Sequence, residues 1–223
     1  MKVVNMSLTA SVMNQFVAEL RDVNVQKDRM RFRRNLERIG EMQAYEISKN
    51  LSYAERVVQT PLGKANMELP REQVVVGTVF RAGLPHHQGF LNVFDGADNA
   101  FVSAFRYYKD EAQREVDVHI EYIVTPDLNG RTLLLVDPML ATGESMELAL
   151  DALVTRGKPS QIHLVCVVAS QTGVDHLLEL YAERDDITLW CAAIDPMLNE
   201  YSYIVPGLGD AGDLAFGKKL SNR

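Results

Sequence analysis

Five short apolar runs rich in β-branched residues follow one another from residue 74 onward. They lack the alternation of polar and apolar positions that a half-exposed strand shows, which is typical of strands covered on both faces. The runs are Val74–Phe80, Ala100–Arg106, Thr132–Asp137, Ile162–Ala169 and Ile187–Ile194. We therefore predict five buried strands.

Apolar stripes at helical spacing lie between several of these runs. Ser145–Gly157 carries a clean stripe that ends at a glycine, a typical helix stop, and Thr172–Arg184 shows the same spacing. Strands that alternate with helices through short connections predict an α/β protein with a parallel, doubly wound sheet. In such sheets ligands bind beyond the carboxyl ends of the strands, so the residues that follow each run are the candidates for chemistry.

The N-terminal part of the chain predicts two helices. Residues 8–23 have apolar positions at helical spacing, and a basic stretch from Lys27 to Arg38 continues with a second apolar stripe. The six Lys and Arg residues of this stretch raise RNA binding as an alternative, but no aromatic platform for bases accompanies them. We interpret the stretch as a solvated or subunit-contacting helix face.

Two later segments fall outside the alternation of strands and helices. Residues 107–130 are polar with period-two apolar positions near their middle, which predicts a β-hairpin placed over the carboxyl ends of the strands as a lid. Tyr201–Gly217 holds four glycines and Pro206, which predicts a constrained irregular loop. No repeat or Gly/Ser linker divides the chain, so we expect a single domain over residues 1–223.

Composition narrows the class of protein. The net charge of −7 disfavours a protein that coats nucleic acid or an anionic membrane. Cys166 and Cys191 both lie in apolar runs, so we expect buried, reduced thiols and neither a disulfide framework nor a metal site. No apolar run approaches the roughly 18 residues of a membrane span, and the N-terminus lacks the apolar stretch of a secretory signal. We expect a cytoplasmic protein.

The segment Asp137–Ser145 has the chemistry of an anion site. Backbone N–H groups at the start of a helix have no partner within the helix and attract anions, and Gly143 lets the backbone approach a phosphate closely. Thr142 and Ser145 add hydroxyl donors, and Ser145 is the predicted N-cap. Asp137 would repel phosphate but suits two sugar hydroxyls. The alternative is a capped helix whose Asp137 merely closes a turn.

A nucleoside-triphosphate loop does not fit this segment, since no Gly-Lys-Ser/Thr follows, and a dinucleotide fingerprint needs three spaced glycines. Instead, Val136-Asp-Pro-Met-Leu-Ala-Thr-Gly-Glu-Ser145 resembles the phosphoribosyl-pyrophosphate loop of type I phosphoribosyltransferases, specifically that of the uracil phosphoribosyltransferase family. Phe80-Arg-Ala-Gly-Leu-Pro85 and Tyr203-Ile-Val-Pro-Gly-Leu-Gly-Asp-Ala-Gly-Asp213 resemble further motifs of that family, in the right order. A weaker match runs through Arg31-Phe-Arg33, Gly40 and Tyr45-Glu46.

The resemblance implies a fold, a reaction and partners. The fold would be a type I phosphoribosyltransferase: a parallel sheet flanked by helices, a lid β-hairpin at about residues 107–130, and a small hood with a base-binding loop at about 199–217. The reaction would convert uracil and phosphoribosyl pyrophosphate to UMP and pyrophosphate, a step of pyrimidine salvage. The resemblance further implies a homo-oligomer, dimer or tetramer, and Mg²⁺ carried mainly by the pyrophosphate substrate, with no metal site in the protein.

The resemblance also assigns residues. Phosphoribosyl pyrophosphate would be bound by Arg81, Arg106, Asp137, Pro138, Met139, Leu140, Ala141, Thr142, Gly143, Glu144, Ser145 and Asp210. Uracil would be bound by Ile204, Gly209, Asp210 and Ala211, mainly through backbone groups of a rigid turn. The catalytic roles would fall to Asp137, Arg106 and Asp210. Asp213 would be a structural anchor.

Some positions depart from the family pattern or from the expected chemistry. Glu144 replaces a glycine of the loop, and because a carboxylate would repel bound phosphate we expect its side chain to face solvent. Gln88 stands where the family has an aspartate, and we have no physical account of the effect of this difference. His86 and His87 share no helix face and have no carboxylate cluster beside them, so we expect structural or solvent-facing roles.

Two other functions remain open from the sequence. One is a pyrimidine-sensing RNA-binding regulator on the same fold, against which the acidic net charge argues. The other is a transferase for orotate or a purine, against which the loop Tyr203–Asp213 argues.

Overall fold

The computed structural model describes residues 1–108 and 116–219, with side chains described outside 104–121. The strands of the main sheet are β1 (Lys2–Asn5), β4 (Val74–Phe80), β5 (Asp98–Tyr108), β6 (Val116–Val124), β7 (Thr132–Val136), β8 (Met139–Leu140), β9 (Gln161–Ser170) and β10 (Ile187–Asp195). Their order is β1-β10-β9-β7-β4-β5-β6, with β8 beside β9. Neighbouring strands are parallel except β5 and β6, which are antiparallel. This sheet confirms the predicted fold class.

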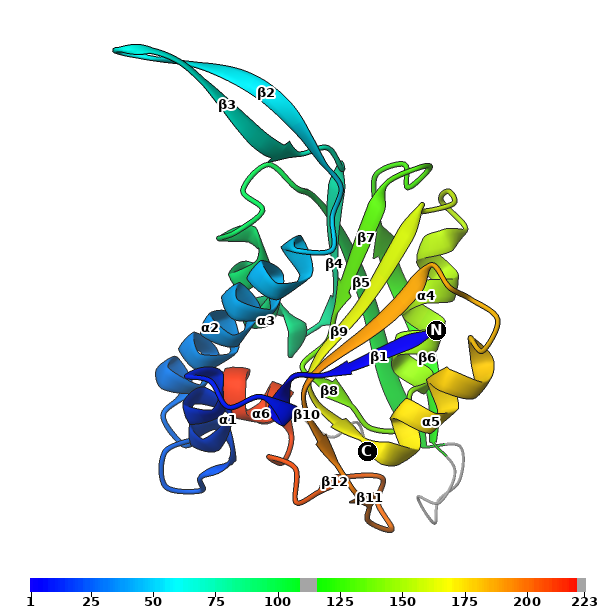
Figure 1. The fold of residues 1–223 in the computed structure, drawn as a ribbon. Helices are drawn as coiled ribbons and strands as arrows, with labels where there is room; N and C mark the ends of the chain where they lie inside the picture. Colours follow the sequence, from blue (N-terminus) through cyan, green and yellow to red (C-terminus); the bar gives the residue numbers. More distant parts are fainter. Residues whose placement is uncertain (109–115, 220–223) are drawn as a thin grey trace.

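Helices cover both faces of the sheet (Figure 1). They are α1 (Met13–Arg21), α2 (Arg29–Ser48), α3 (Gly83–Leu91), α4 (Glu144–Val154), α5 (Gln171–Leu180) and α6 (Ala211–Phe216), with a 3-10 turn η1 (Met6–Leu8). In β7, Leu133 and Leu135 pack in the cluster of α4 and α5, whereas Leu134 and Val136 pack with α2 and α3. Both faces of the strand are therefore buried, which explains why its sequence shows no polar alternation.

The five predicted strands and the helices around residues 8–23, 27–38, 145–157 and 172–184 are confirmed. The C-terminal segment is less irregular than expected: β11 (Met197–Leu198) pairs with β12 (Ile204–Val205), and α6 follows. Asp210 caps α6 by accepting a hydrogen bond from the Asp213 N–H at 2.9 Å, so a six-residue helix forms among the glycines.

The predicted hairpin over 107–130 needs a correction. β5 and β6 pair along their length and form an edge of the main sheet, rather than a separate insertion between two sheet strands. Since β5 is parallel to β4, its carboxyl end at Tyr108 lies at the same edge of the sheet as the end of β4. Residues 109–115 lie outside the described residues, so the lid role stays a prediction.

A hairpin that the sequence analysis missed projects from the body of the molecule (Figure 1). β2 (Tyr53–Thr60) pairs antiparallel with β3 (Gly63–Pro70), and most side chains of both strands are exposed. Val57 and Met67 of these strands are exposed apolar side chains, and so is Leu62 in the turn between the strands. We call residues 53–70 the arm.

The two adjacent histidines have the expected structural role. His86 and His87 are buried on α3, and His86 Nε2 lies 2.6 Å from Gln43 Oε1. Gln43 in turn donates to the Cys166 carbonyl at 2.9 Å, so this contact joins α3, α2 and β9. Burial lowers the pKa of His86 from 6.5 to about 3, which keeps the imidazole neutral. Cys166 and Cys191 are buried free thiols, as predicted.

The basic side chains of α2 are engaged within the chain. Arg31 forms a bidentate contact with Glu19 of α1, Arg33 donates to the Ala215 carbonyl at 2.7 Å, and Arg34 pairs with Glu37 at 2.6 Å. These contacts do not choose between a solvated and a subunit-contacting helix face, so that interpretation stays a prediction. Within the described residues, no helix is long and apolar enough to cross a membrane.

Candidate active site

The segment Asp137–Ser145, which we call the phosphate loop, joins β7 to α4 through the short strand β8. Gly143 has φ +96°, a left-handed conformation that suits glycine, and it is the N-cap of α4. Its carbonyl accepts from the N–H groups of Met146 and Glu147, both at 3.0 Å. Ser145 lies inside the helix, so the predicted Ser145 cap is wrong. The left-handed glycine turns the chain into the helix without needing a hydroxyl cap.

Neighbouring strands hold the backbone of this loop. The Pro138 carbonyl accepts from the N–H groups of Val167 and Val168 at 3.1 and 3.0 Å, and the Ser170 hydroxyl donates to the Ala141 carbonyl at 2.5 Å. These bonds to β9 and its end fix the loop before any ligand arrives. A fixed set of outward N–H groups at a helix start is suited to a phosphate.

The two acidic side chains of the loop differ in surroundings. Asp137 is half-buried at the end of β7, and its Oδ1 accepts from the Met139 N–H at 3.3 Å. Glu144 is also half-buried, and its Oε2 accepts from the Thr142 hydroxyl at 3.2 Å. The Glu144 carboxylate is therefore partly exposed and has a donor two residues earlier, so its direction toward solvent stays a prediction. Thr142, a predicted phosphate donor, bonds to a carboxylate in this structure.

Arg81 follows β4 at its carboxyl end, where the sequence analysis expected it, after a cis peptide bond from Phe80. Gly83 packs against the sheet: a Cβ there would lie 2.1 Å from the Thr78 hydroxyl, so only glycine fits beside Arg81. The Arg81 guanidinium is exposed and lies 3.2 Å from the Asp213 carboxylate of α6. Asp213 thus links Arg81 to the C-terminal segment, which agrees with its predicted anchoring role.

The predicted base loop is a tight turn. Ile204 and Ala211 are buried at its two ends, and Val205–Pro206 is a cis peptide. Gly209 has φ +94°, a conformation that side chains rarely adopt, although a Cβ there would meet only the Leu214 side chain, at 3.8 Å. Asp210 directs one carboxylate oxygen to the start of α6, and the other lies 3.7 Å from Lys219 Nζ.

Two residues that hold this turn were missed. Asp195, at the end of β10, accepts from the Gly207 N–H at 2.8 Å, and Arg21 of α1 donates to the Gly207 carbonyl at 3.0 Å. Arg21 and Asp195 also form a bidentate ion pair at 2.7 and 2.8 Å. The position of Asp195 directly after a buried strand was a signal for chemistry that the sequence analysis did not use.

The structure brings the three motifs together at one edge of the sheet. Met139 and Ala141 of the phosphate loop belong to the same apolar cluster as Ala82, Ile204 and Ala211. The base loop and the Arg81 segment therefore lie beside the phosphate loop, at the carboxyl ends of the strands. Arg106 lies in β5, opposite Val118, but its side chain is outside the described part of the structure.

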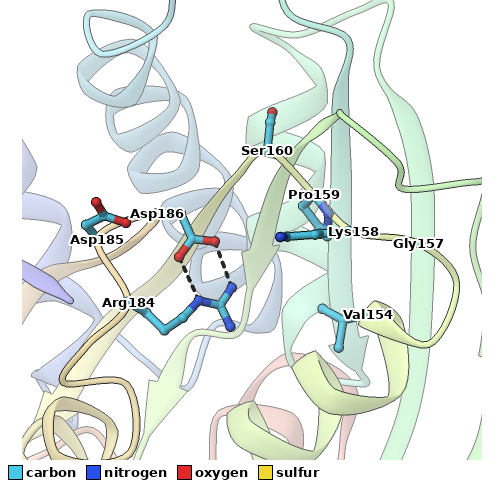
Figure 2. A pocket seen from close by; sticks show the side chains of 8 residues that line it. All are labelled: Val154, Gly157, Lys158, Pro159, Ser160, Arg184, Asp185 and Asp186. Carbon is cyan, nitrogen blue, oxygen red and sulfur yellow. Dashed lines mark hydrogen bonds and ion pairs between the residues drawn. The ribbon is translucent and has the colours of Figure 1, made fainter.

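A surface groove lies at the opposite end of the sheet from these motifs. Figure 2 shows the side chains that line it. It is lined by Val154, Gly157, Lys158, Pro159, Ser160, Arg184, Asp185 and Asp186, near the amino ends of β9 and β10. The Arg184 guanidinium donates two hydrogen bonds of 2.7 Å to the Asp186 carboxylate there. We do not assign this groove to the active site.

Comparison with known proteins fits this arrangement. The sequence pattern of uracil phosphoribosyltransferases matches residues 7–218. The chain belongs to the uracil phosphoribosyltransferase family. Uracil phosphoribosyltransferases of Porphyromonas gingivalis are 54% identical over 220 residues, which cover 99% of this chain and 100% of theirs. The uracil phosphoribosyltransferase of Methanothermobacter thermautotrophicus is 38% identical and covers 84% of each chain.

A solved structure is similar to this chain over almost its whole fold. A protein of Aquifex aeolicus superposes with a TM-score of 0.83 at 28% identity, over 96% of this chain and 98% of its own. The three motifs that carry the sequence resemblance all lie within residues 7–218, the part of the chain that the family pattern matches. The described residues contain no group of three or more His, Cys, Asp or Glu side chains placed to hold a metal ion.

Proposed function

We propose that this chain transfers the phosphoribosyl group of phosphoribosyl pyrophosphate to uracil, giving UMP and pyrophosphate. The observation that carries the proposal is the phosphate loop, with its left-handed Gly143 at the start of α4, beside the rigid turn at Ile204–Ala211. Uracil N1 attacks the anomeric carbon while the bond from that carbon to pyrophosphate breaks, and the proton on N1 is released. The transition state has oxocarbenium character, so the protein contributes mainly positioning and charge stabilisation.

Each motif takes one part of the substrates in this proposal. The N–H groups of Gly143 to Ser145 and the Thr142 hydroxyl hold the 5-phosphate, and Asp137 accepts from the two ribose hydroxyls. Thr142 must exchange its bond to Glu144 for the phosphate when the substrate binds. Arg81 must likewise leave Asp213 to grip the leaving pyrophosphate.

The base would be held by the turn that Asp195 and Arg21 fix. Uracil presents a flat edge on which acceptors and donors alternate, and backbone N–H and C=O groups of a rigid turn can match such an edge. Both flanks of the turn are packed, since Ile204 and Ala211 are buried. The turn therefore keeps its shape before the base arrives, which supports base selection.

Mg²⁺ fits this site as a companion of the pyrophosphate. Carboxylate oxygens suit Mg²⁺, and the Asp210 oxygen that pairs with Lys219 at 3.7 Å would exchange this long ion pair for the cation. When bound, Mg²⁺ supplies charge neutralisation for the departing pyrophosphate. Arg81 and Asp210 would hold that end of the substrate.

Initial rates with a panel of nucleobases test the substrate assignment. The purified protein with phosphoribosyl pyrophosphate and Mg²⁺ should form a nucleotide from uracil at least about a hundredfold faster than from orotate, hypoxanthine or guanine, because a polar site rejects mismatched bases strongly. Faster turnover of a purine or orotate would overturn the choice of base. An RNA gel shift with the same preparation tests the regulator alternative, which no described contact favours.

We also infer that the protein works as a homo-oligomer. The exposed apolar side chains of the arm support this inference, because an isolated hairpin with exposed apolar residues usually packs against another protein surface. Light scattering should give a mass of at least twice the 25.0 kDa of one chain. A monomeric mass at assay concentration would contradict it.

A further inference from the structure

His176, on α5, lies directly behind the phosphate loop. A Cβ built on Gly143 would lie 2.7 Å from His176 Cδ2, so the imidazole edge fills the space next to the Gly143 backbone. Gly143 carries the left-handed turn that points the first N–H groups of α4 outward. The ring therefore contacts the residue on which the geometry of the loop depends.

Glu147 fixes the orientation of this ring. Its Oε2 lies 2.6 Å from His176 Nε2, and its own N–H donates to the Gly143 carbonyl at 3.0 Å. One residue of α4 thus contacts both Gly143 and the ring that packs on Gly143. Both side chains are partly exposed, at 39% for His176 and 26% for Glu147, so the pair is not a core packing element.

The start of α5 supports the same loop at two further points. The Ser170 hydroxyl donates to the Ala141 carbonyl and accepts from the Gly173 N–H at 2.9 Å. A Cβ on Gly173 would lie 2.5 Å from the Ala141 carbonyl oxygen, so α5 rests on the loop backbone there. Ser170, Gly173 and His176 follow one another at helical spacing along the loop. His176 is the member of this row that reaches the phosphate-binding end.

We propose that His176 and Glu147 are positioning residues for the 5-phosphate. They hold Gly143 so that the N–H groups of the loop are already aligned when the phosphoribosyl substrate binds. This inference rests on the proposed function of the phosphate loop. Arg81 bonds to Asp213, whereas His176 and Glu147 bond to each other on α5 and α4, so we expect the pair to act on phosphate binding alone.

The variants His176→Ala, Glu147→Gln and His176→Ala/Glu147→Gln test the proposal. Asp175→Ala is the matched control, because Asp175 is exposed on α5 and pairs with Gln171 at 2.7 Å. His176→Ala should weaken calorimetric binding of ribose 5-phosphate about tenfold and raise the KM for phosphoribosyl pyrophosphate similarly, as expected for a slightly misplaced site. The kcat, the KM for uracil and the binding of inorganic pyrophosphate should change by less than about twofold.

Two further comparisons separate positioning from general stability. The double variant should be no weaker than His176→Ala, since the two residues act as one unit, and His176→Gln should recover part of the affinity because its amide can still donate to Glu147. Asp175→Ala should bind both ligands as the native protein does. If His176→Ala does not fold, Glu147→Gln makes the same comparison.

The proposal is overturned if folded variants bind ribose 5-phosphate as tightly as the native protein does. It is equally overturned if the variants lose affinity for ribose 5-phosphate, pyrophosphate and uracil to the same extent, because the substitution would then act on the fold as a whole. Failure of the native protein itself to bind ribose 5-phosphate would instead contradict the proposed function of the loop.

Discussion

Asp195→Asn tests whether the ion pair with Arg21 holds the base loop. Asp195 is 6% exposed, and its carboxylate makes three hydrogen bonds of 2.7–2.8 Å, two to the Arg21 guanidinium and one to the Gly207 N–H. The amide keeps one acceptor, loses the charge and turns an NH₂ group toward a donor. A charged hydrogen bond contributes about 1.5–3 kcal/mol, and Arg21 is partly solvated, so the free energy of unfolding should fall by about 2–3 kcal/mol.

The same change should act on uracil more than on the phosphoribosyl substrate. Gly207 lies within the base loop, whereas the phosphate loop has its own anchors on β9. We expect the KM for uracil to rise at least about tenfold, while the KM for phosphoribosyl pyrophosphate changes by less than about threefold. Steady-state kinetics and urea unfolding of the same preparations measure both effects.

Asp186→Asn is the matched control for this experiment. Asp186 makes the same bidentate contact with Arg184 (Figure 2), but near the amino end of β10. Such a surface pair contributes at most about 1 kcal/mol to stability, and its loss should leave both KM values unchanged. The reasoning is refuted if folded Asp195→Asn keeps the native KM for uracil, or if the two variants have equal effects on it.

Four further predictions follow from the site and the core. Asp137→Asn should lower kcat/KM at least roughly tenfold, because a charged acceptor for the ribose is lost; native kinetics in a folded variant would remove Asp137 from the site. Glu144→Gly should tighten calorimetric binding of phosphoribosyl pyrophosphate by about 1–2 kcal/mol, because it removes a like charge and frees Thr142; unchanged affinity would contradict this. Gly209→Val should cut UMP synthesis by orders of magnitude while phosphoribosyl pyrophosphate still binds, because φ +94° disfavours a side chain; near-normal synthesis would place the base elsewhere. Urea unfolding should show that the free energy of unfolding falls as the pH drops from 6.5 toward 3, by up to about 1.4 kcal/mol per pH unit for His86. In this range the imidazole binds a proton in the unfolded chain but stays neutral when it is buried. Stability that stays flat over that range would contradict the burial argument.

The sequence predicted those parts of the fold whose burial imposes a pattern. Strands such as Val74–Phe80 are covered on both faces, so their residue types alone identify them. The arm could not be found in this way, because its strands pack against no core and the charged residues of Tyr53–Thr60 and Gly63–Pro70 break any apolar pattern. α6 was missed because its six residues lie among glycines and depend on the Asp210 cap.

For the site, motifs predicted which segments meet, but not how individual side chains bond. The phosphate loop, the Arg81 segment and the base loop were each predicted and lie together. The Arg21–Asp195 pair joins residues that are 174 positions apart in the sequence, so no local sequence pattern predicts this ion pair. The direction of Glu144 depends on a single rotamer and on the nearby Thr142 hydroxyl, which sequence reasoning cannot resolve.

The most direct test of the central claim is UMP formation by the purified native protein. Uracil, phosphoribosyl pyrophosphate and Mg²⁺ are mixed with the protein, and UMP and pyrophosphate are quantified by chromatography, with Asp137→Asn run in parallel. We predict that UMP and pyrophosphate appear in equal amounts and that the variant forms them at least roughly tenfold more slowly. A native, folded protein that forms no UMP under these conditions would contradict the account.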